Sequence, residues 1–181
     1  MTDKERIKRE LEIAREIQIN SLPLYEPNYD GLEICASLDA AHEVGGDYYD
    51  YLELSPSKLG VIVGDVVGKG TSAAFYMSKI QGFIKTLHLG STKPQLMLDK
   101  LNLLIKKNFN PEFFFTALYG IFDTQEKQLQ IFRIGHNGLI YLNAKKKKVE
   151  IIEPAGIGFG MSANETFSDK LKSETIAYSE G

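Results

Sequence analysis

Two neighbouring segments decide the fold: residues 45–51 (GGDYYDY) and residues 61–70 (VIVGDVVGKG). The second begins with a continuous apolar run, which is typical of a strand buried on both faces. The first begins with a flexible glycine pair and then continues as a strand. A turn at residues 55–58 (SPSK) allows the two strands to pair as a hairpin. This pairing predicts that Asp47 and Asp65 lie close together.

The two aspartates have a functional and a structural interpretation. Carboxylates held close together repel each other unless they share a proton or a cation, and oxygen ligands suit a hard divalent ion such as Mg²⁺ or Mn²⁺. In the structural interpretation, Asp47 ends a turn and Asp65 caps a helix that begins near Gly70. A phosphate-binding loop is excluded, because three residues separate Gly64 from Gly68 where such a loop has four, and Gly70 replaces the Ser or Thr that should follow the lysine.

Ordered motifs extend along nearly the whole chain. Residues 43–50 (EVGGDYYD) and 64–70 (GDVVGKG) resemble the metal-dependent PPM-type serine/threonine phosphatases, and the similarity is closer to the bacterial SpoIIE/RsbU-type branch. Further matching motifs follow in the family order: AREIQ at 14–18 with Leu22-Pro23, FTA at 115–117, GHN at 135–137 and GFG at 158–160. The combination of these motifs carries the resemblance.

The resemblance implies metal-assisted hydrolysis of a phosphoserine or phosphothreonine. In such enzymes two ions, Mn²⁺ or Mg²⁺, bind carboxylates and activate the attacking water. Asp65 matches the aspartate that bridges both metals, Asp47 matches an acidic ligand of one metal, and Val66 matches a ligand that uses its backbone carbonyl. The family forms no covalent intermediate, so Cys35 needs no nucleophilic role. His136 precedes a predicted tight turn, where it is either a structural or a catalytic residue.

The chain departs from the family pattern at its C-terminal end. Family members continue into a Thr-Asp-Gly segment and a later aspartate that complete one metal site, and this chain ends at Gly181 before both. The resemblance therefore implies a domain that lacks its C-terminal strands and retains three metal ligands: Asp47, Asp65 and the Val66 carbonyl. We expect such a chain to be nearly inactive by itself. Two function classes stay open, a protein phosphatase and a non-catalytic regulatory or binding fragment that keeps the fold.

The hydrophobic pattern predicts an α+β fold. Apolar periodicity indicates helices at residues 2–20, 70–89 and 93–108, and alternation or apolar runs indicate strands at 32–40, 47–54 and 59–66, with several more strands after Pro111. Hairpin connections predominate, so the sheets should be largely antiparallel. This order fits the resembled fold, a layered sandwich of two mostly antiparallel β-sheets flanked by helices. We expect residues 1–22 to form an N-terminal linker helix and residues 23–181 to form the phosphatase domain.

The first predicted helix has a broad apolar surface formed by Ile7, Leu11, Ala14 and the neighbouring Ile13 and Ile17. In one interpretation this helix packs on its own domain. In the other, part of it faces a partner, either an upstream sensor domain, as in the resembled family, or the same helix of a second copy in a homodimer.

Composition restricts the location and the partners of the chain. It has 181 residues and a net charge of −3, so it carries no basic footprint for nucleic acid. Its single cysteine fits a reducing compartment, and it contains neither a signal peptide nor an apolar run long enough for membrane insertion. These features predict a cytoplasmic protein. The resemblance implies that its substrate is a small phosphorylated regulatory protein of the anti-sigma-factor-antagonist type.

Overall fold

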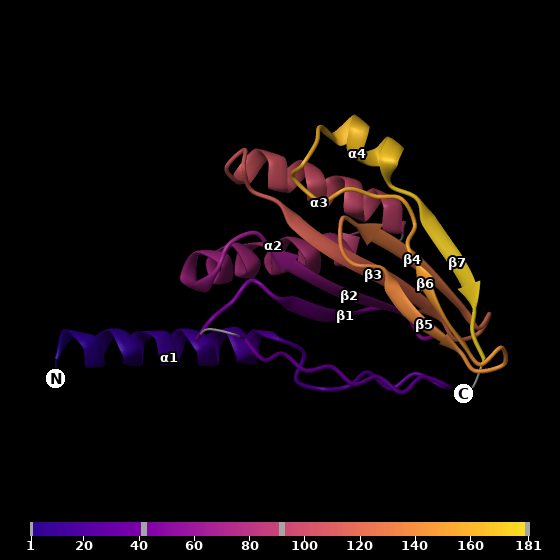
Figure 1. Cartoon of the computed structure of the whole chain (residues 1–181), viewed down its shortest axis with the longest axis horizontal. Helices are drawn as coiled ribbons and strands as arrows, with labels where there is room; N and C mark the ends of the chain where they lie inside the picture. Colours follow the sequence, from indigo (N-terminus) through magenta and orange to yellow (C-terminus); the bar gives the residue numbers. More distant parts are fainter. Residues whose placement is uncertain (1, 41–42, 91–92, 180–181) are drawn as a thin grey trace.

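The computed structural model describes residues 2–40, 43–90 and 93–179. Its elements follow the predicted order of helix, hairpin, two helices and further strands (Figure 1). They are α1 (Asp3–Ser21), β1 (Tyr48–Ser55), β2 (Lys58–Val66), α2 (Gly70–Gly90), α3 (Pro94–Asn108), β3 (Phe115–Asp123), β4 (Gln128–Ile134), β5 (Leu139–Asn143), β6 (Lys148–Ile152), α4 (Asn164–Lys170) and β7 (Ser173–Ala177). The predicted α+β class is confirmed.

The main sheet has five strands in the order β1-β2-β3-β4-β7, and every neighbouring pair is antiparallel. The predicted hairpin between β1 and β2 is present, with Tyr48 opposite Gly64. On its other side β2 pairs with β3, which places Asp65 opposite Thr116. The strand that carries Asp65 is therefore paired along both edges.

The two faces of this sheet are covered differently. Helices α2 and α3 pack on one face and enclose the larger core, which includes Ile62, Ile84, Leu101 and Phe115. On the opposite face, the antiparallel hairpin β5–β6 contributes Ile152 to a smaller cluster with Leu129 and Ile131 of β4. The arrangement is a sheet-on-sheet sandwich with helices outside the larger sheet.

The outer side of the β5–β6 hairpin is apolar. Ile140 pairs with Ile151, and Leu142 pairs with Val149. All four side chains are more than half exposed, with values of 72%, 65%, 65% and 56% for Ile140, Leu142, Ile151 and Val149. The turn that joins the two strands contains Lys145, Lys146 and Lys147, and Lys148 is the first residue of β6.

The prediction of a strand at residues 32–40 is wrong. Leu32 forms an isolated bridge with Tyr29, and residues 33–40 form no strand. Instead, residues 35–39 line a cavity together with Tyr48 and Tyr49 of β1. The alternating pattern thus comes from an extended segment that turns one side toward the domain without pairing its backbone.

Helix α1 starts at the predicted capping box, in which Thr2 Oγ1 accepts from the Glu5 amide and the Glu5 carboxylate accepts from the Thr2 amide. None of its residues is buried, and its isoleucines are at least 44% exposed. In Figure 1 it lies apart from the sheets, and its N-terminal end projects beyond α2. Whether a partner covers this helix stays a prediction. Within the part of the chain that the structure describes, no helix has the length and apolarity needed to cross a membrane.

Candidate functional site

Asp65 is placed by the backbone of the central strand. The side chains of Ile62 and Val66 point into the helix-covered core, and Gly64 between them is buried on the same face. The alternation of β2 therefore turns Asp65 to the opposite, open face. Gly64 is required here, because a Cβ at this position would lie 2.4 Å from the Phe115 ring. The result is an exposed carboxylate at the end of a strand that is well packed on its other face.

Asp47 is placed by the loop before β1. The Gly46 carbonyl accepts a hydrogen bond from the Val66 amide at 3.3 Å, which ties this loop to the end of β2. Gly46 lies so close to β2 that a Cβ there would be 2.9 Å from the Val66 carbonyl oxygen. This contact brings the Asp47 segment beside Val66, whose carbonyl is one of the predicted ligands.

The two carboxylates line one cavity and influence each other. A cavity of about 240 Å³ is bordered by Asp47, Asp65, the glycines before Asp47 and the turn at residues 68–70. Partial desolvation, the larger cause, and repulsion from Asp47 raise the pKa of Asp65 above its ordinary value, although the residue stays exposed. His136 and the Val66 amide oppose this shift. A bound cation would remove the repulsion between the two carboxylates.

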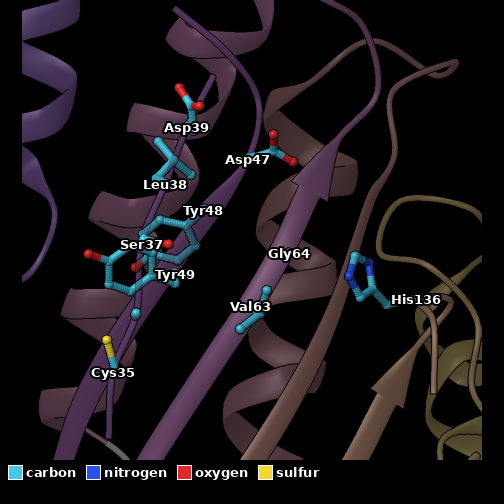
Figure 2. Close-up of a pocket in the computed structure, with 11 residues that line it drawn as sticks. Cys35, Ser37, Leu38, Asp39, Asp47, Tyr48, Tyr49, Val63, Gly64 and His136 are labelled. Carbon is cyan, nitrogen blue, oxygen red and sulfur yellow. The ribbon is translucent and has the colours of Figure 1, made fainter. Parts of the chain in front are cut away.

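His136 also reaches this site. A second cavity, of about 500 Å³, is lined by both Asp47 and His136, and the end of β2 lies between these two side chains in Figure 2. His136 Nδ1 lies 2.9 Å from Thr116 Oγ1, and Thr116 is the residue paired with Asp65 across β2 and β3. Burial lowers the pKa of His136, while Asp65 and Asp47 act in the opposite direction. The structure thus places His136 beside the two aspartates, and its catalytic role stays a prediction.

Thr116 is the site residue to which the sequence reasoning gave no role of its own. It belongs to the FTA motif at 115–117, but its role depends on the β2–β3 register that sets it opposite Asp65. The hydroxyl lies 3.5 Å from the Asp65 carbonyl oxygen and 2.9 Å from His136 Nδ1. The hydroxyl donates to the Asp65 carbonyl oxygen, and which atom donates between Thr116 Oγ1 and His136 Nδ1 depends on the tautomer of the imidazole.

Asp50 lies away from the site, as the alternation of β1 predicts. Its side chain is 4% exposed and accepts a hydrogen bond of 2.6 Å from the Tyr48 hydroxyl. Lys85 of α2 lies 3.5 Å from the same carboxylate oxygen. Burial and the Asp50 carboxylate raise the pKa of Tyr48, so this hydroxyl stays protonated as the donor. Asp50 therefore has a structural role between β1 and α2.

The donor set at the site fits a hard divalent cation in part. Asp47 and Asp65 offer carboxylate oxygens to one cavity, which is the ligand type that Mg²⁺ and Mn²⁺ prefer. Among residues 2–40, 43–90 and 93–179, no group of three or more His, Cys, Asp or Glu is arranged to hold a metal ion. The assignment of Asp47, Asp65 and Val66 as ligands stays a prediction.

A comparison with protein families decides the classification. The family model of Stage II sporulation protein E (SpoIIE) matches residues 55–179, which is more than half of the chain. The chain belongs to the SpoIIE family. The β2 strand with Asp65, both helices over the sheet and the segment with His136 all lie inside the matched region.

Individual relatives agree with this classification. The chain is 29% identical over 159 residues to phosphoserine phosphatase RsbU of Bacillus subtilis (strain 168), covering 88% of this chain and 47% of RsbU. It is 32% identical over 133 residues to phosphoserine phosphatase RsbP of the same organism, covering 71% of this chain and 33% of RsbP. The chain thus spans less than half the length of both relatives.

A solved structure supports the fold independently. The SiaA-PP2C domain of Pseudomonas aeruginosa superposes with a TM-score of 0.75 at 16% identity, covering 97% of this chain and 69% of that domain. At this identity the likeness shows the fold alone. It agrees with the PPM-like sandwich predicted from the motif order.

Proposed function

We propose that this chain is part of the phosphatase domain of a bacterial signalling protein that hydrolyses phosphoserine or phosphothreonine on a small regulatory protein. The observation that carries the proposal is the convergence of Asp47 and Asp65 on one cavity, produced by the β1–β2 hairpin in a SpoIIE-family chain. The names of RsbU and RsbP as phosphoserine phosphatases support the reaction class. We further propose that residues 1–22 form a linker helix and that residues 23–181 belong to the phosphatase domain. We also propose that the protein is cytoplasmic.

In this proposal Asp47, Asp65 and the Val66 carbonyl hold Mn²⁺ or Mg²⁺. Such ions polarise phosphoryl oxygens and supply an activated water at neutral pH. The protein contributes position and charge. The two carboxylates attract cations, because a cation offsets their mutual repulsion. The 500 Å³ cavity beside them admits a phosphorylated side chain. The His136 ring, which contacts Thr116 through Nδ1, is one of the polar groups that line that cavity.

A substrate of the anti-sigma-factor-antagonist type fits this geometry. The cavity is lined by the extended segment at residues 35–39 and the end of β2, so it is a surface cleft that a folded phosphoprotein can approach. A second candidate function, a non-catalytic regulatory or binding module, is favoured by one observation: no metal-holding group of three acidic, His or Cys side chains occurs among the residues that the structure describes.

The deciding experiment compares three aspartate variants in the full-length protein. We expect Asp65→Asn and Asp47→Asn to lower turnover of a phosphoserine protein with Mn²⁺ by at least about 10²–10³-fold, because each removes an electrostatic contributor at the reacting phosphate. Asp30→Asn is the matched control, since Asp30 is exposed and lies outside the cavities lined by Asp47 and Asp65. A wild-type protein that binds its phosphoprotein without hydrolysing it would favour the second candidate.

A further inference from the structure

The carboxamide of Gln18 binds both backbone groups of Gly45. Gln18 Nε2 donates to the Gly45 carbonyl oxygen at 2.7 Å, and the Gly45 amide donates to Gln18 Oε1 at 3.1 Å. A side-chain amide here pairs with a peptide group as neighbouring strands pair with each other. Gln18 lies near the end of α1, so this contact links α1 to the loop that carries Asp47.

The loop held by Gln18 is fixed on its N-terminal side by Val44, whose side chain is buried, and the two residues that follow are glycines. Gly45 and Gly46 have no side chains, and a glycine pair has more conformational freedom than any other dipeptide. A Cβ added at Gly45 would have one neighbouring atom within 4 Å, the Ala40 Cβ at 3.7 Å. Gly46 is fixed from the other side by the Val66 amide, at 3.3 Å. The loop is thus held between α1 and the end of β2, and Asp47 is the next residue.

We propose that Gln18 is a positioning residue that holds Asp47 toward Asp65 through the Gly45 peptide. Gln18 does not touch the reacting groups; it limits the conformations of the two residues that precede Asp47. This inference rests on the proposed function only in taking Asp47 as a metal ligand. Residues that orient a metal ligand typically change metal affinity by about 10–100-fold when they are replaced, and we expect an effect of this order here.

The chain offers a matched control for this contact. Gln81 of α2 donates through Nε2 to the Ser21 carbonyl oxygen at 2.7 Å, so it also fastens the C-terminal end of α1. It makes no hydrogen bond to the Asp47 loop. Gln18→Met and Gln81→Met are therefore the same chemical change at two anchors of one helix, and only the first removes the link to Gly45.

The test measures Mn²⁺ affinity by calorimetry in the full-length protein, with the melting temperature as a second readout. We expect Gln18→Met to weaken Mn²⁺ binding at least tenfold and Gln81→Met to change it less than twofold, at similar losses of melting temperature. Equal weakening by both variants would mean that docking of α1 in general sets the loop, and this overturns a specific role for Gln18. Unchanged affinity in Gln18→Met overturns it as well.

A metal-free readout separates this inference from the proposed function. Amide hydrogen exchange at residues 45–47 should become faster in Gln18→Met and stay at the wild-type rate in Gln81→Met. If wild-type protein binds no Mn²⁺, the proposed metal site is wrong, and the exchange rates still decide whether Gln18 fixes the loop. Wild-type exchange in Gln18→Met would overturn the inference even if Mn²⁺ binds.

Discussion

Asp65 and Asp47 are held at one site by different kinds of structure. Asp65 is part of β2, which has hydrogen-bonded neighbours on both edges and a packed core behind it. Asp47 follows two glycines in a loop held by the Gln18 side-chain amide, by one backbone hydrogen bond and by the buried side chain of Val44. The two proposed ligands thus come from different kinds of segment, one from a strand paired on both edges and the other from a loop that contains two glycines. The loop is therefore the place where small changes should alter the site most.

The largest effect among the structural variants should come from Gly46→Ala. The added Cβ would lie 2.9 Å from the Val66 carbonyl oxygen and 3.2–3.3 Å from the Cβ atoms of Val66 and Ala73. Relieving this contact must shift the loop or the end of β2, at a cost of about 1–3 kcal/mol in stability. We expect Mn²⁺ affinity measured by calorimetry to fall by about tenfold or more, since at least one of the two segments that carry the proposed ligands is displaced.

Gly45→Ala is the control for that prediction. Its Cβ would meet only Ala40, at an ordinary contact distance of 3.7 Å, so neither stability nor Mn²⁺ affinity should change much. If Gly46→Ala binds Mn²⁺ as well as Gly45→Ala does, the loop is more adaptable than the comparison of the two aspartates assumes.

An intermediate effect should come from Asp50→Ala, which tests stability without touching the site. The change leaves the buried Tyr48 hydroxyl without its acceptor and removes the partner of Lys85. Loss of such a buried hydrogen bond costs about 1–3 kcal/mol in the free energy of unfolding. Thermal denaturation should show the loss, and Mn²⁺ affinity should stay at the wild-type value. A large drop in affinity would mean that β1 transmits distortion to Asp47.

The smallest effect should come from Asp65→Asn in metal-free protein, and it has the opposite sign. The pKa of Asp65 is raised in the folded state, so its protonated form favours folding, and this contribution is lost as the pH rises through the folded-state pKa. At pH 7 the ionised side chain therefore destabilises the metal-free fold. Asparagine removes this penalty, so the melting temperature of the variant should be slightly higher than that of the wild type.

The dependence of this difference on pH and metal provides the check. The gain should shrink when the pH is lowered to where Asp65 is protonated, and Mn²⁺ should raise the melting temperature of the wild type but not of the variant. A lower melting temperature for metal-free Asp65→Asn at pH 7 would contradict the repulsion between Asp47 and Asp65.

Features with strong local signals were predicted from the sequence. The three longer helices and the β1–β2 hairpin follow from periodicity and turn chemistry, which depend on neighbouring residues. The prediction that β2 is buried on both faces is wrong, because Val63 is 45% exposed and Asp65 lies on the same open face. The contacts of Gln18 and Thr116 were not predicted, because the first spans 27 positions and the second depends on the register of two strands. Helix α4 was missed because its seven residues are too few to show a period.

The predicted strand at residues 32–40 failed for a different reason. Alternation of apolar and polar residues indicates which side of a segment packs against the domain. A segment can show this pattern by side-chain packing alone, without backbone pairing. Whether its backbone also pairs depends on the distance and direction of the nearest strand edge, here that of β1. The sequence of the segment itself contains no information on either quantity.

The apolar outer side of the β5–β6 hairpin affects how the protein behaves in concentrated solution. Four branched aliphatic side chains on a short exposed hairpin are a surface on which copies of a chain can stick together. The lysines at 145–148 are at the tip of the same hairpin, and clustered charge next to an apolar strand opposes such self-association. Because the net charge of the chain is only −3, this local protection matters more than overall repulsion. Salt shortens the range of that protection, so the solubility of the protein should fall as ionic strength rises.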